Sequence, residues 1–441
     1  MKSVSASNVQ LRVTPAGKLR GELRVPGDKS VSHRAVMLGA IATGTSRVSG
    51  FLAGEDTLAT LRAFQHMGVR IERPEATRLE IQGVGLDGLR AAPGPLDLGN
   101  SGTSARLLTG LLAGQKFDSE IIGDGSLMQR PMGRVVEPLR RMGANLICTE
   151  AGTLPLKIQG GAHLRGSEFK LAVASAQLKS ALLLAGMYAD GDTCVIEPAP
   201  TRDHTERMLR KFGVEVQGDG KRICVSRQPL RATDVQVPAD ISSAAFFLVV
   251  ASIVPGSDLL LTEVGINPTR AAVIDILRAM GAHIEIHATG VVGSEPVADL
   301  RVRHSPLRGI SIPEHLVPIA IDEFPAILIA AACAEGTTLL TGAAELRVKE
   351  SDRIAAMAAG LQALGIDATP APDGMCVTGG TLRGGVINSV GDHRIAMAFA
   401  VAGCRAAGEV VINDCANVNT SFPGFADCLR TLGGNITEAV A

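Results

Sequence analysis

One short pattern occurs six times along the chain, and it constrains the fold more than any other feature. In each copy a leucine or phenylalanine is followed, after three residues, by a glycine and then by an alternating apolar stretch. The intervals between successive glycines run from 68 to 84 residues, and the six are Gly68, Gly143, Gly213, Gly281, Gly365 and Gly433. A glycine at this place closes a helix in the left-handed conformation, and the alternation predicts a strand. Six copies at similar spacing predict a repeat architecture.

A second element recurs in the same register. Six helices that are apolar almost all round are predicted to begin after a small polar or acidic residue, near Asp28, Asn100, Ser175, Asp240, Asp322 and Asp392. Helices of this kind are buried, whereas the helices that end at the repeat glycines carry charges on one face and should lie outside. Each unit is therefore predicted to be of the α/β class: buried helix, strand, outer helix, strand, with further short strands.

The six units can form one ring or two groups of three. Basic and small polar residues begin the first three buried helices, whereas Asp240, Asp322 and Asp392 begin the last three. This difference favours two domains with separate roles facing a shared cleft. Pro-Gly and Val-Pro are suitable crossover sequences, so we predict one domain over 27–237 and another over 1–26 plus 238–441.

Composition excludes several classes of function. With 43 basic and 44 acidic residues the net charge is −1, and there is no Trp and one Tyr, so neither nucleic acid nor an acidic membrane is an expected partner. The longest apolar run, 244–254, is shorter than the roughly 18 residues that span a bilayer. The first 17 residues contain no apolar signal segment, and the eight cysteines form no CxxC pair. We expect a cytoplasmic protein with reduced, buried cysteines.

Basic residues gather at the starts of helices. Free N–H groups at a helix start attract anions, and a charged side chain strengthens such a site. Any one of these residues can be a solvated surface charge, but together they indicate a cleft for substrates with more than one phosphate or carboxylate. They are Lys29, Arg34, Arg106, Arg130, Arg202, Lys349, Arg353 and Arg394.

Two carboxylates, Asp322 and Glu350, lie among these cations in the sequence. A carboxylate at a helix start is often only a cap, and this alternative applies to Asp322. In a cleft lined by cations, such carboxylates can instead move protons as a general base and a general acid.

Cofactor motifs are absent or incomplete. GVGLDG (83–88) is not followed by a helical pattern, GDKS lacks the glycine that a phosphate-binding loop places before its lysine, and the nine histidines include no HExxH. We therefore expect no dinucleotide, no ATP at that motif and no zinc.

Eight segments taken together resemble one enzyme family, that of 5-enolpyruvylshikimate 3-phosphate synthase. They are PGDKSVSHRA, LGNSGTSARL, GDGSLMQRPMGR, ASAQLKSALLLAG, TRDHTERML, IDEFP, RVKESDR and GDHRIAMAFA. The resemblance runs from Leu19 to Gly433 and is closer to the second, bacterial class of the family. It implies the two-domain enolpyruvyl transferase fold, with six βαβαββ units, three per domain.

The resemblance also implies the reaction. This transferase of the shikimate pathway moves the enolpyruvyl group of phosphoenolpyruvate to the 5-hydroxyl of shikimate 3-phosphate and releases phosphate, by addition and elimination. It needs no cofactor or metal, and the herbicide glyphosate inhibits it. A monomer is expected.

Site residues follow motif by motif from the same resemblance. Asp322 resembles the group that takes the 5-hydroxyl proton, Glu350 the acid that protonates the methylene carbon, and Lys29 a lysine shared by both substrates. The expected shikimate 3-phosphate contacts are Lys29, Ser30, Arg34, Ser175, Ala176, Gln177, Arg202, Asp322 and Lys349. The expected phosphoenolpyruvate contacts are Lys29, Asn100, Gly102, Thr103, Arg130, Gln177, Arg353 and Arg394.

Two residues depart from the first class of the family. Ala176 replaces a second serine, for which Arg202 is a candidate compensation, and Thr420 replaces a lysine that contacts phosphoenolpyruvate. Both changes leave affinity and the degree of glyphosate sensitivity open, although Gly102 is the residue of the sensitive type.

Other functions remain as alternatives. The sister family that uses UDP-N-acetylglucosamine shares the fold, but it typically has a cysteine just before the arginine that matches Arg130, and GDGSLMQR has none. RNA 3′-phosphate cyclases use related repeats, but the neutral net charge and the lack of a nucleotide-attachment motif argue against them. A non-catalytic repeat scaffold would keep the glycines and apolar helices but would not need Asp322 and Glu350.

Overall fold

The computed structural model describes residues 9–218 and 220–440. The chain divides into two compact units. We call Gly27–Val237 with Val292–Glu295 the inserted unit, and the described part of Met1–Pro26, Pro238–Val291 and Pro296–Ala441 the terminal unit. The division falls after Pro26 and after Val237, and the short segment 292–295 joins the inserted unit, which no sequence pattern indicates.

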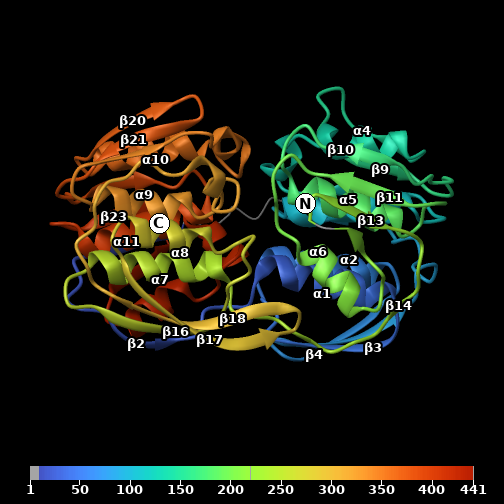
Figure 1. Ribbon diagram of the computed structural model, residues 1–441, viewed down its shortest axis with the longest axis horizontal. Coiled ribbons are helices and arrows are strands. Elements are labelled where there is room, and N and C mark those ends of the chain that lie inside the picture. Colours follow the sequence, from blue (N-terminus) through green and yellow to red (C-terminus); the bar gives the residue numbers. More distant parts are fainter. Residues whose placement is uncertain (1–8, 219, 441) are drawn as a thin grey trace. The chain divides into compact units, whose positions relative to one another are not determined.

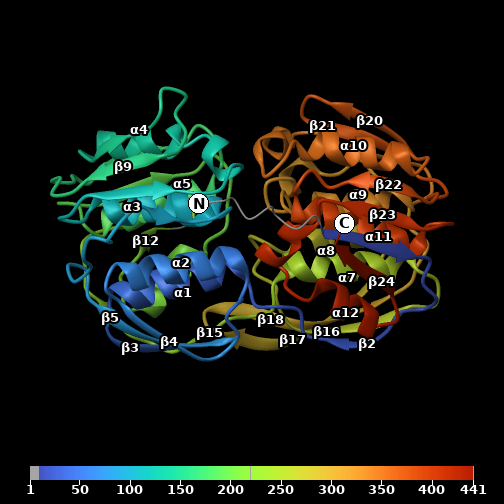
Figure 2. The same cartoon turned by 180° about the vertical axis from the view of Figure 1, so that it is seen from behind.

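Six buried helices, one per repeat, are present as the sequence predicts; Figure 1 labels five of them and Figure 2 labels α3. They are α1 (Lys29–Ile41), α3 (Gly102–Ala113), α5 (Ala176–Gly186), α7 (Ile241–Ile253), α9 (Phe324–Ala332) and α11 (His393–Arg405). All thirteen residues of α7 are buried. The outer helices are α2 (Glu55–His66), α4 (Gly133–Arg141), α6 (His204–Lys211), α8 (Ala272–Ala279), α10 (Arg353–Ala363) and α12 (Phe425–Thr431).

The repeat glycines end these outer helices. All six have positive φ, between 80° and 104°. A side chain in this conformation is strained, so glycine is the residue that closes the helix without cost and turns the chain into the next strand.

Each repeat forms its own sheet. The inserted unit holds β14-β3-β5-β4 with β15 beside β3, then β6-β7-β9-β8 and β10-β11-β13-β12. Their strands are β3 (Ala42–Ser49), β4 (Arg70–Glu75), β5 (Arg78–Val84), β6 (Leu96–Asp97), β7 (Ser119–Ile122), β8 (Asn145–Ile147), β9 (Leu156–Gln159), β10 (Glu168–Lys170), β11 (Thr193–Ile196), β12 (Gln217–Gly218), β13 (Arg222–Val225), β14 (Leu230–Arg231) and β15 (Val235–Gln236).

The terminal unit holds three more sheets, β17-β18-β16-β2, β19-β21-β20 and β22-β23-β1-β24. Their strands are β1 (Val9–Thr14), β2 (Arg20–Leu23), β16 (Asp258–Gly265), β17 (His283–Val292), β18 (Glu295–Arg303), β19 (Thr337–Leu340), β20 (Asp367–Ala371), β21 (Gly374–Thr378), β22 (Gly385–Asn388), β23 (Val410–Asn413) and β24 (Asn435–Val440). Figure 2 shows this unit from behind.

The sheets share one pairing pattern. In the second repeat, for example, β6 pairs parallel with β7, and β7 and β8 each pair antiparallel with β9. The first and last repeats borrow strands from distant parts of the chain: β14 and β15 pair parallel with β3, and β1 pairs antiparallel with β23 and β24. In the fifth repeat the parallel strand is reduced to isolated bridges at Arg308 and Ser311. The βαβαββ repeat is therefore confirmed, and the N-terminal strands complete sheets of the terminal unit.

Each unit has its own hydrophobic core. In the terminal unit α7, α9 and α11 pack on one another, and in the inserted unit α3 packs closely on α5. A Cβ at Gly110 of α3 would lie 2.1 Å from the carbonyl oxygen of Ala181 in α5, so the close approach of these helices requires glycine. This packing brings the N-termini of α3 and α5 to one side of the inserted unit, where Thr103 and Gln177 are within hydrogen-bond distance.

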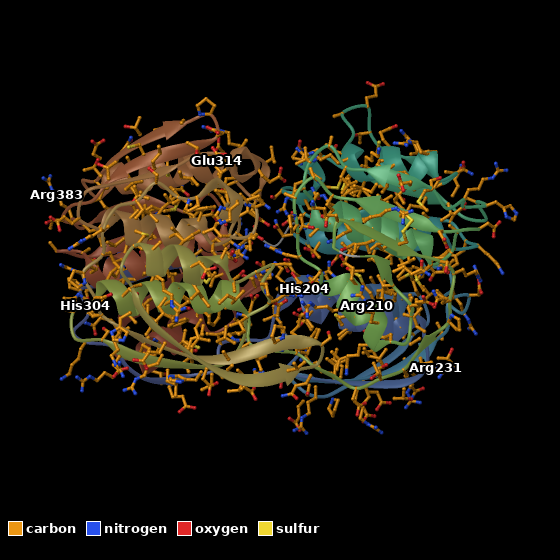
Figure 3. The ribbon with its side chains drawn as sticks, in the orientation of Figure 1. His204, Arg210, Arg231, His304, Glu314 and Arg383 are labelled. Atoms are coloured by element: carbon orange, nitrogen blue, oxygen red, sulfur yellow. A yellow bond between two sulfur atoms is a disulfide. The ribbon has the colours of Figure 1, made fainter. Side chains whose placement is uncertain are left out.

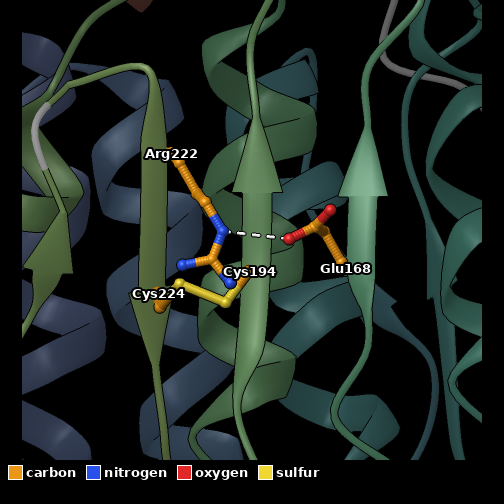
Figure 4. Close-up of a disulfide and its surroundings, with 4 residues drawn as sticks. All are labelled: Glu168, Cys194, Arg222 and Cys224. Carbon is orange, nitrogen blue, oxygen red and sulfur yellow. Dashed lines mark hydrogen bonds and ion pairs between the residues drawn. A yellow bond between two sulfur atoms is a disulfide. The ribbon is translucent and has the colours of Figure 1, made fainter.

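One expectation about the cysteines is wrong. Cys194 and Cys224 form a disulfide between β11 and β13, where the strand register places them directly opposite each other (Figure 4). Arg222 and Glu168 form an ion pair of 2.9 Å across the same sheet. The cysteines are 30 residues apart, and only the strand pairing reveals that they are neighbours. Among the described residues, no helix is long and apolar enough to cross a membrane.

Candidate active site

The first cluster of predicted site residues lies at the start of α1. Asp28 caps the helix by accepting a hydrogen bond of 2.9 Å from the Val31 amide, so the neighbouring Lys29 and Ser30 occupy the first turn. The Lys29 ammonium forms an ion pair with Asp56, whose side chain is only 6% exposed. Lys29 is itself about one-fifth exposed, so its charge lies near the surface of the helix end, where an anion is favoured.

Arg34, one turn further along α1, is almost completely buried. Its guanidinium donates to Thr205 Oγ1 at 2.7 Å, to Ser180 Oγ at 2.8 Å and to the Ser30 carbonyl oxygen at 3.0 Å. Burial lowers the pKa of Arg34 to about 10, although Glu206 and Asp28 oppose this shift and Arg202 adds to it. Arg34 therefore remains charged at neutral pH.

The start of α3 gathers the residues predicted for phosphoenolpyruvate. Asn100 donates to Asp124 Oδ2 at 2.7 Å and accepts from Arg130 Nη2 at 2.5 Å. Gly102 is the first helical residue, and a Cβ there would lie 2.8 Å from Arg106 Nη1 and 3.0 Å from Arg130 Nη1. The absence of a side chain at Gly102 therefore leaves room for both guanidinium groups.

The start of α5 is linked to this cluster. Ser175 caps α5 through the Leu178 amide at 3.3 Å, and Ala176 is the first helical residue. Gln177 accepts from Arg106 Nη1 at 3.0 Å and donates to Thr103 Oγ1 at 3.2 Å. Gln177 is thus held between two groups of α3, and its contact with both substrates stays a prediction.

The terminal unit gathers its predicted residues around Arg353, whose side chain is 1% exposed. The guanidinium lies 2.8 Å from Asp392 Oδ2, 2.6 Å from Glu350 Oε2 and 3.4 Å from Asp322 Oδ1. Burial disfavours this charge, but the three carboxylates outweigh burial and raise the pKa of Arg353. Burial likewise acts to raise the pKa of Asp392, but Arg353 outweighs it and the pKa is lowered.

Asp322 is not the helix cap that the alternative interpretation requires. The N-cap residue of α9 is Glu323, and Asp322 precedes it. Its carboxylate lies 3.3 Å from Lys349 Nζ as well as near Arg353, and its backbone carbonyl accepts from Arg394 Nη1 at 2.9 Å. Asp322, Lys349, Glu350, Arg353 and Arg394 are therefore neighbours, as the resemblance implies.

Three of the residues that organise these clusters are not predicted as such from the sequence. Asp392 is predicted only as a helix start, and Asp124 lies in the GDGSLMQRPMGR segment without an assigned role. Arg270 is 3% exposed and lies 3.4 Å from Asp240 and 3.7 Å from Glu323. One signal was available: Arg130 follows Asn100 by 30 residues, Arg270 follows Asp240 by 30, and Arg353 follows Asp322 by 31.

Within the described part of the chain, no group of three or more His, Cys, Asp or Glu side chains could hold a metal ion.

The repeat-built fold is that of an enolpyruvyl transferase. The EPSP synthase (3-phosphoshikimate 1-carboxyvinyltransferase) family matches residues 13–429. A protein of that name from Methylococcus capsulatus is 64% identical over 423 residues, which cover 96% of this chain and 97% of the relative. Another from Alkalilimnicola ehrlichii is 61% identical over 435 residues, which cover 98% of both chains. The chain belongs to the EPSP synthase family.

Solved structures agree with this assignment. The 2.37 Å structure of EPSP synthase from Acinetobacter baumannii has a TM-score of 0.88 at 53% identity and covers 98% of this chain and 100% of that one. The enolpyruvyl transferase NikO from Streptomyces tendae has a TM-score of 0.78 at 18% identity, covering 99% and 100%, which shows that the fold extends to more distant proteins.

Proposed function

We propose that this chain transfers the enolpyruvyl group of phosphoenolpyruvate to the 5-hydroxyl of shikimate 3-phosphate, as the family name states. The observation that carries the site assignment is the position of Arg353, which gathers Asp322 and Glu350 around one buried cation. This arrangement provides a candidate base, a candidate acid and a fixed positive charge within a few ångströms. A structural scaffold would not need it.

Most of the proposed contacts for shikimate 3-phosphate lie in the inserted unit, and Asp322 and Lys349 belong to the terminal unit. Lys29 and Ser30 lie at the start of α1, and Ser175 and Ala176 lie at the start of α5, so backbone N–H groups and an ammonium converge on an anion. Arg34 and Arg202 add guanidinium charge, whose hydrogen bonds to phosphate contribute about 1.5–3 kcal/mol each. Ala176 offers no hydroxyl, and Arg202 takes the place of that contact.

The proposed guanidinium contacts of phosphoenolpyruvate are Arg130, Arg353 and Arg394. Asn100 fixes Arg130, and Gly102 leaves the space beside it open. Arg353 and Arg394 are the corresponding contacts of the terminal unit. Each binds a carboxylate or phosphate through charge-assisted hydrogen bonds, so the substrate is oriented before the reaction.

The reaction proceeds by addition and elimination. In the addition, Asp322 accepts the proton of the 5-hydroxyl while that oxygen attacks C2 of phosphoenolpyruvate, and Glu350 gives a proton to the methylene carbon. In the elimination, the methyl carbon formed in this way returns a proton to the Glu350 carboxylate, and the C–O bond to phosphate breaks with its electron pair leaving on the phosphate. Lys29 and the arginines stabilise charge on the phosphate that leaves.

Four further expectations belong to this proposal. The protein works in the cytoplasm, as a monomer, without a metal or organic cofactor. Glyphosate competes with phosphoenolpyruvate beside Gly102.

Phosphate release from phosphoenolpyruvate tests the proposal directly, with shikimate 3-phosphate and UDP-N-acetylglucosamine offered separately. Release with shikimate 3-phosphate alone supports it. Release with the nucleotide sugar alone would assign the chain to the sister reaction, and release with neither, from folded protein, would favour a binding scaffold.

A further inference from the structure

The inserted unit contains a buried group of three charges that the reaction does not use. Lys179 Nζ lies 2.7 Å from Glu197 Oε2 and 2.7 Å from Glu206 Oε1, and all three side chains are at most 2% exposed. We call these residues the buried triad. They come from three consecutive pieces of the third repeat: α5, the residue after β11, and α6.

Stability alone does not explain the triad. Removing three charges from water has a large desolvation cost, and apolar side chains of similar volume often stabilise such a place equally well or better. Burial acts to lower the pKa of Lys179, but the two glutamates outweigh it and the pKa is raised, so the lysine is charged. A charged lysine between two carboxylates fixes the relative positions of the elements that carry them.

These elements are the ones that form the Arg34 site. Lys179 and Ser180 are adjacent on α5, and Thr205 and Glu206 are adjacent on α6. The Lys179–Glu206 ion pair therefore lies beside a second link between the same helices, in which Thr205 Oγ1 donates to Ser180 Oγ at 2.7 Å. Arg34 donates to both of these hydroxyl groups. Any shift of α5 against α6 would alter both hydroxyl partners of Arg34 at once.

Glu197 of the triad is hydrogen-bonded to the segment that carries Arg202. Glu197 Oε1 accepts a hydrogen bond from Thr201, the residue just before Arg202. The far end of this segment is held independently, because His204, labelled in Figure 3, contacts Glu295 at 2.7 Å. Glu197 thus holds the segment between β11 and Arg202 in place.

The triad also acts electrostatically on Arg34. Glu206 is the strongest of the charges that favour the ionised form of Arg34. Glu206 therefore supports the positive charge of Arg34 as well as its position.

We propose that Lys179 is a positioning residue for shikimate 3-phosphate: by pairing with Glu206 and Glu197 it holds Arg34 and Arg202 at the spacing that the phosphate requires. This inference rests on the proposed function. It predicts a defect confined to one substrate, because Gln177, the proposed phosphoenolpyruvate contact on α5, is held separately by Arg106 and Thr103 of α3.

Lys179→Met tests this, because methionine keeps much of the side-chain volume and removes the charge. We expect KM for shikimate 3-phosphate to rise about 10–100-fold, the range for loss of an outer partner of a binding residue, while KM for phosphoenolpyruvate stays at the wild-type value. Lys170→Met, at an exposed position of β10, is the matched control and should leave both constants unchanged. A triad that is only structural would lower the melting temperature and leave both KM values unchanged, and that result overturns the proposal.

Two further variants keep the test decisive if Lys179→Met does not fold. Glu206→Gln removes the α5–α6 ion pair and keeps the Lys179–Glu197 pair, whereas Glu197→Gln does the reverse. Each should raise KM for shikimate 3-phosphate alone. If Glu206 acts through Lys179, the double variant Lys179→Met with Glu206→Gln should have the same KM for shikimate 3-phosphate as Lys179→Met alone, because the Lys179–Glu206 pair is already lost in the single variant.

Different results would contradict the proposed function and the positioning role of Lys179. If wild-type protein releases no phosphate with shikimate 3-phosphate, the proposed function is wrong. If wild-type protein is active and the folded triad variants keep the wild-type KM for shikimate 3-phosphate, or raise both KM values together, only the positioning role is wrong.

Discussion

Arg34 of the inserted unit and Arg353 of the terminal unit are both almost fully buried, yet their surroundings shift their pKa values in opposite directions. Arg34 donates to two hydroxyl groups and a carbonyl oxygen, and burial lowers its pKa to about 10. Arg353 lies among three carboxylates, which outweigh burial and raise its pKa. The difference indicates two uses of one residue type. The charge of Arg34 is only partly compensated and suits an incoming phosphate, whereas that of Arg353 also fixes the acids that surround it.

The largest expected effect comes from Arg353→Met. The variant leaves Asp392, Glu350 and Asp322 without their shared cation, and breaking a buried ion pair costs about 3–5 kcal/mol. Denaturant unfolding should show this loss, and activity should fall below detection. Arg383→Met, at an exposed position of the same unit, is the control. Wild-type stability of Arg353→Met would mean that the acids do not depend on it.

Glu350→Gln separates the chemical role of the acid from its structural role. The amide oxygen can still accept from Arg353, so the fold should remain intact, but the proton donor is lost. We expect kcat to fall about 10²–10⁴-fold, the usual contribution of a general acid or base. Steady-state phosphate release and a melting curve measure both parts, and a wild-type kcat would refute the assignment.

Arg34→Met tests the arginine of the inserted unit, for comparison with Arg353→Met in the terminal unit. Thr205 and Ser180 still hydrogen-bond to each other without Arg34, so the unit should lose less stability than the terminal unit loses with Arg353→Met. Loss of a charge-assisted hydrogen bond to phosphate, about 1.5–3 kcal/mol, predicts a roughly 10–150-fold rise in KM for shikimate 3-phosphate. Isothermal titration with that substrate provides an independent value. A stability loss equal to that of Arg353→Met would remove the distinction between the two arginines.

Gly102→Ala should have a smaller effect, confined to phosphoenolpyruvate and its competitor. The new Cβ would lie 2.8 Å and 3.0 Å from guanidinium nitrogens of Arg106 and Arg130, which must move by a few tenths of an ångström. Because both contacts are the far ends of flexible side chains, the fold tolerates the change. We expect KM for phosphoenolpyruvate to rise several-fold and glyphosate to inhibit less. Unchanged inhibition by glyphosate at low phosphoenolpyruvate would contradict the placement of its site.

The sequence predicted the repeat because each copy carries its own local signals. Glycine at each helix end and an apolar helix after a polar cap are visible without any contact information. The borrowed strands were not predicted, since β1, β2, β14 and β15 find their partners far away in the chain. The same holds for the Cys194–Cys224 disulfide, which depends on strand register.

The site residues also divide into those that local sequence patterns predict and those that depend on distant contacts. Lys29, Arg130 and Arg353 were identified from motifs and helix starts, but the charges that hold them in place were not. Asp124 and Lys179 belong to elements whose packing decides their partners, and a sequence does not state which buried charges meet. The roughly 30-residue interval between a helix start and an arginine was the one periodic signal that could have identified Arg270 in advance.

The smallest expected effect is the loss of stability in Asp258→Asn. Because this variant breaks an ion pair on the surface, its loss of stability can be compared with that of the buried pairs around Arg353. Asp258 accepts from Arg301 at 2.9 Å and lies near Arg303, and the hydrogen bond to Arg301 is the main cause of its lowered pKa. A carboxyl whose folded pKa lies below its unfolded value, about 3.9, stabilises the protein above that pH and loses this contribution as the pH falls toward the folded pKa. Exposed pairs contribute less than about 1 kcal/mol, so Asp258→Asn should lower the stability slightly at pH 7 and by still less near pH 3. Denaturant unfolding at both pH values measures this difference. A loss as large as that of Arg353→Met would show that burial is not what makes the Arg353 cluster important.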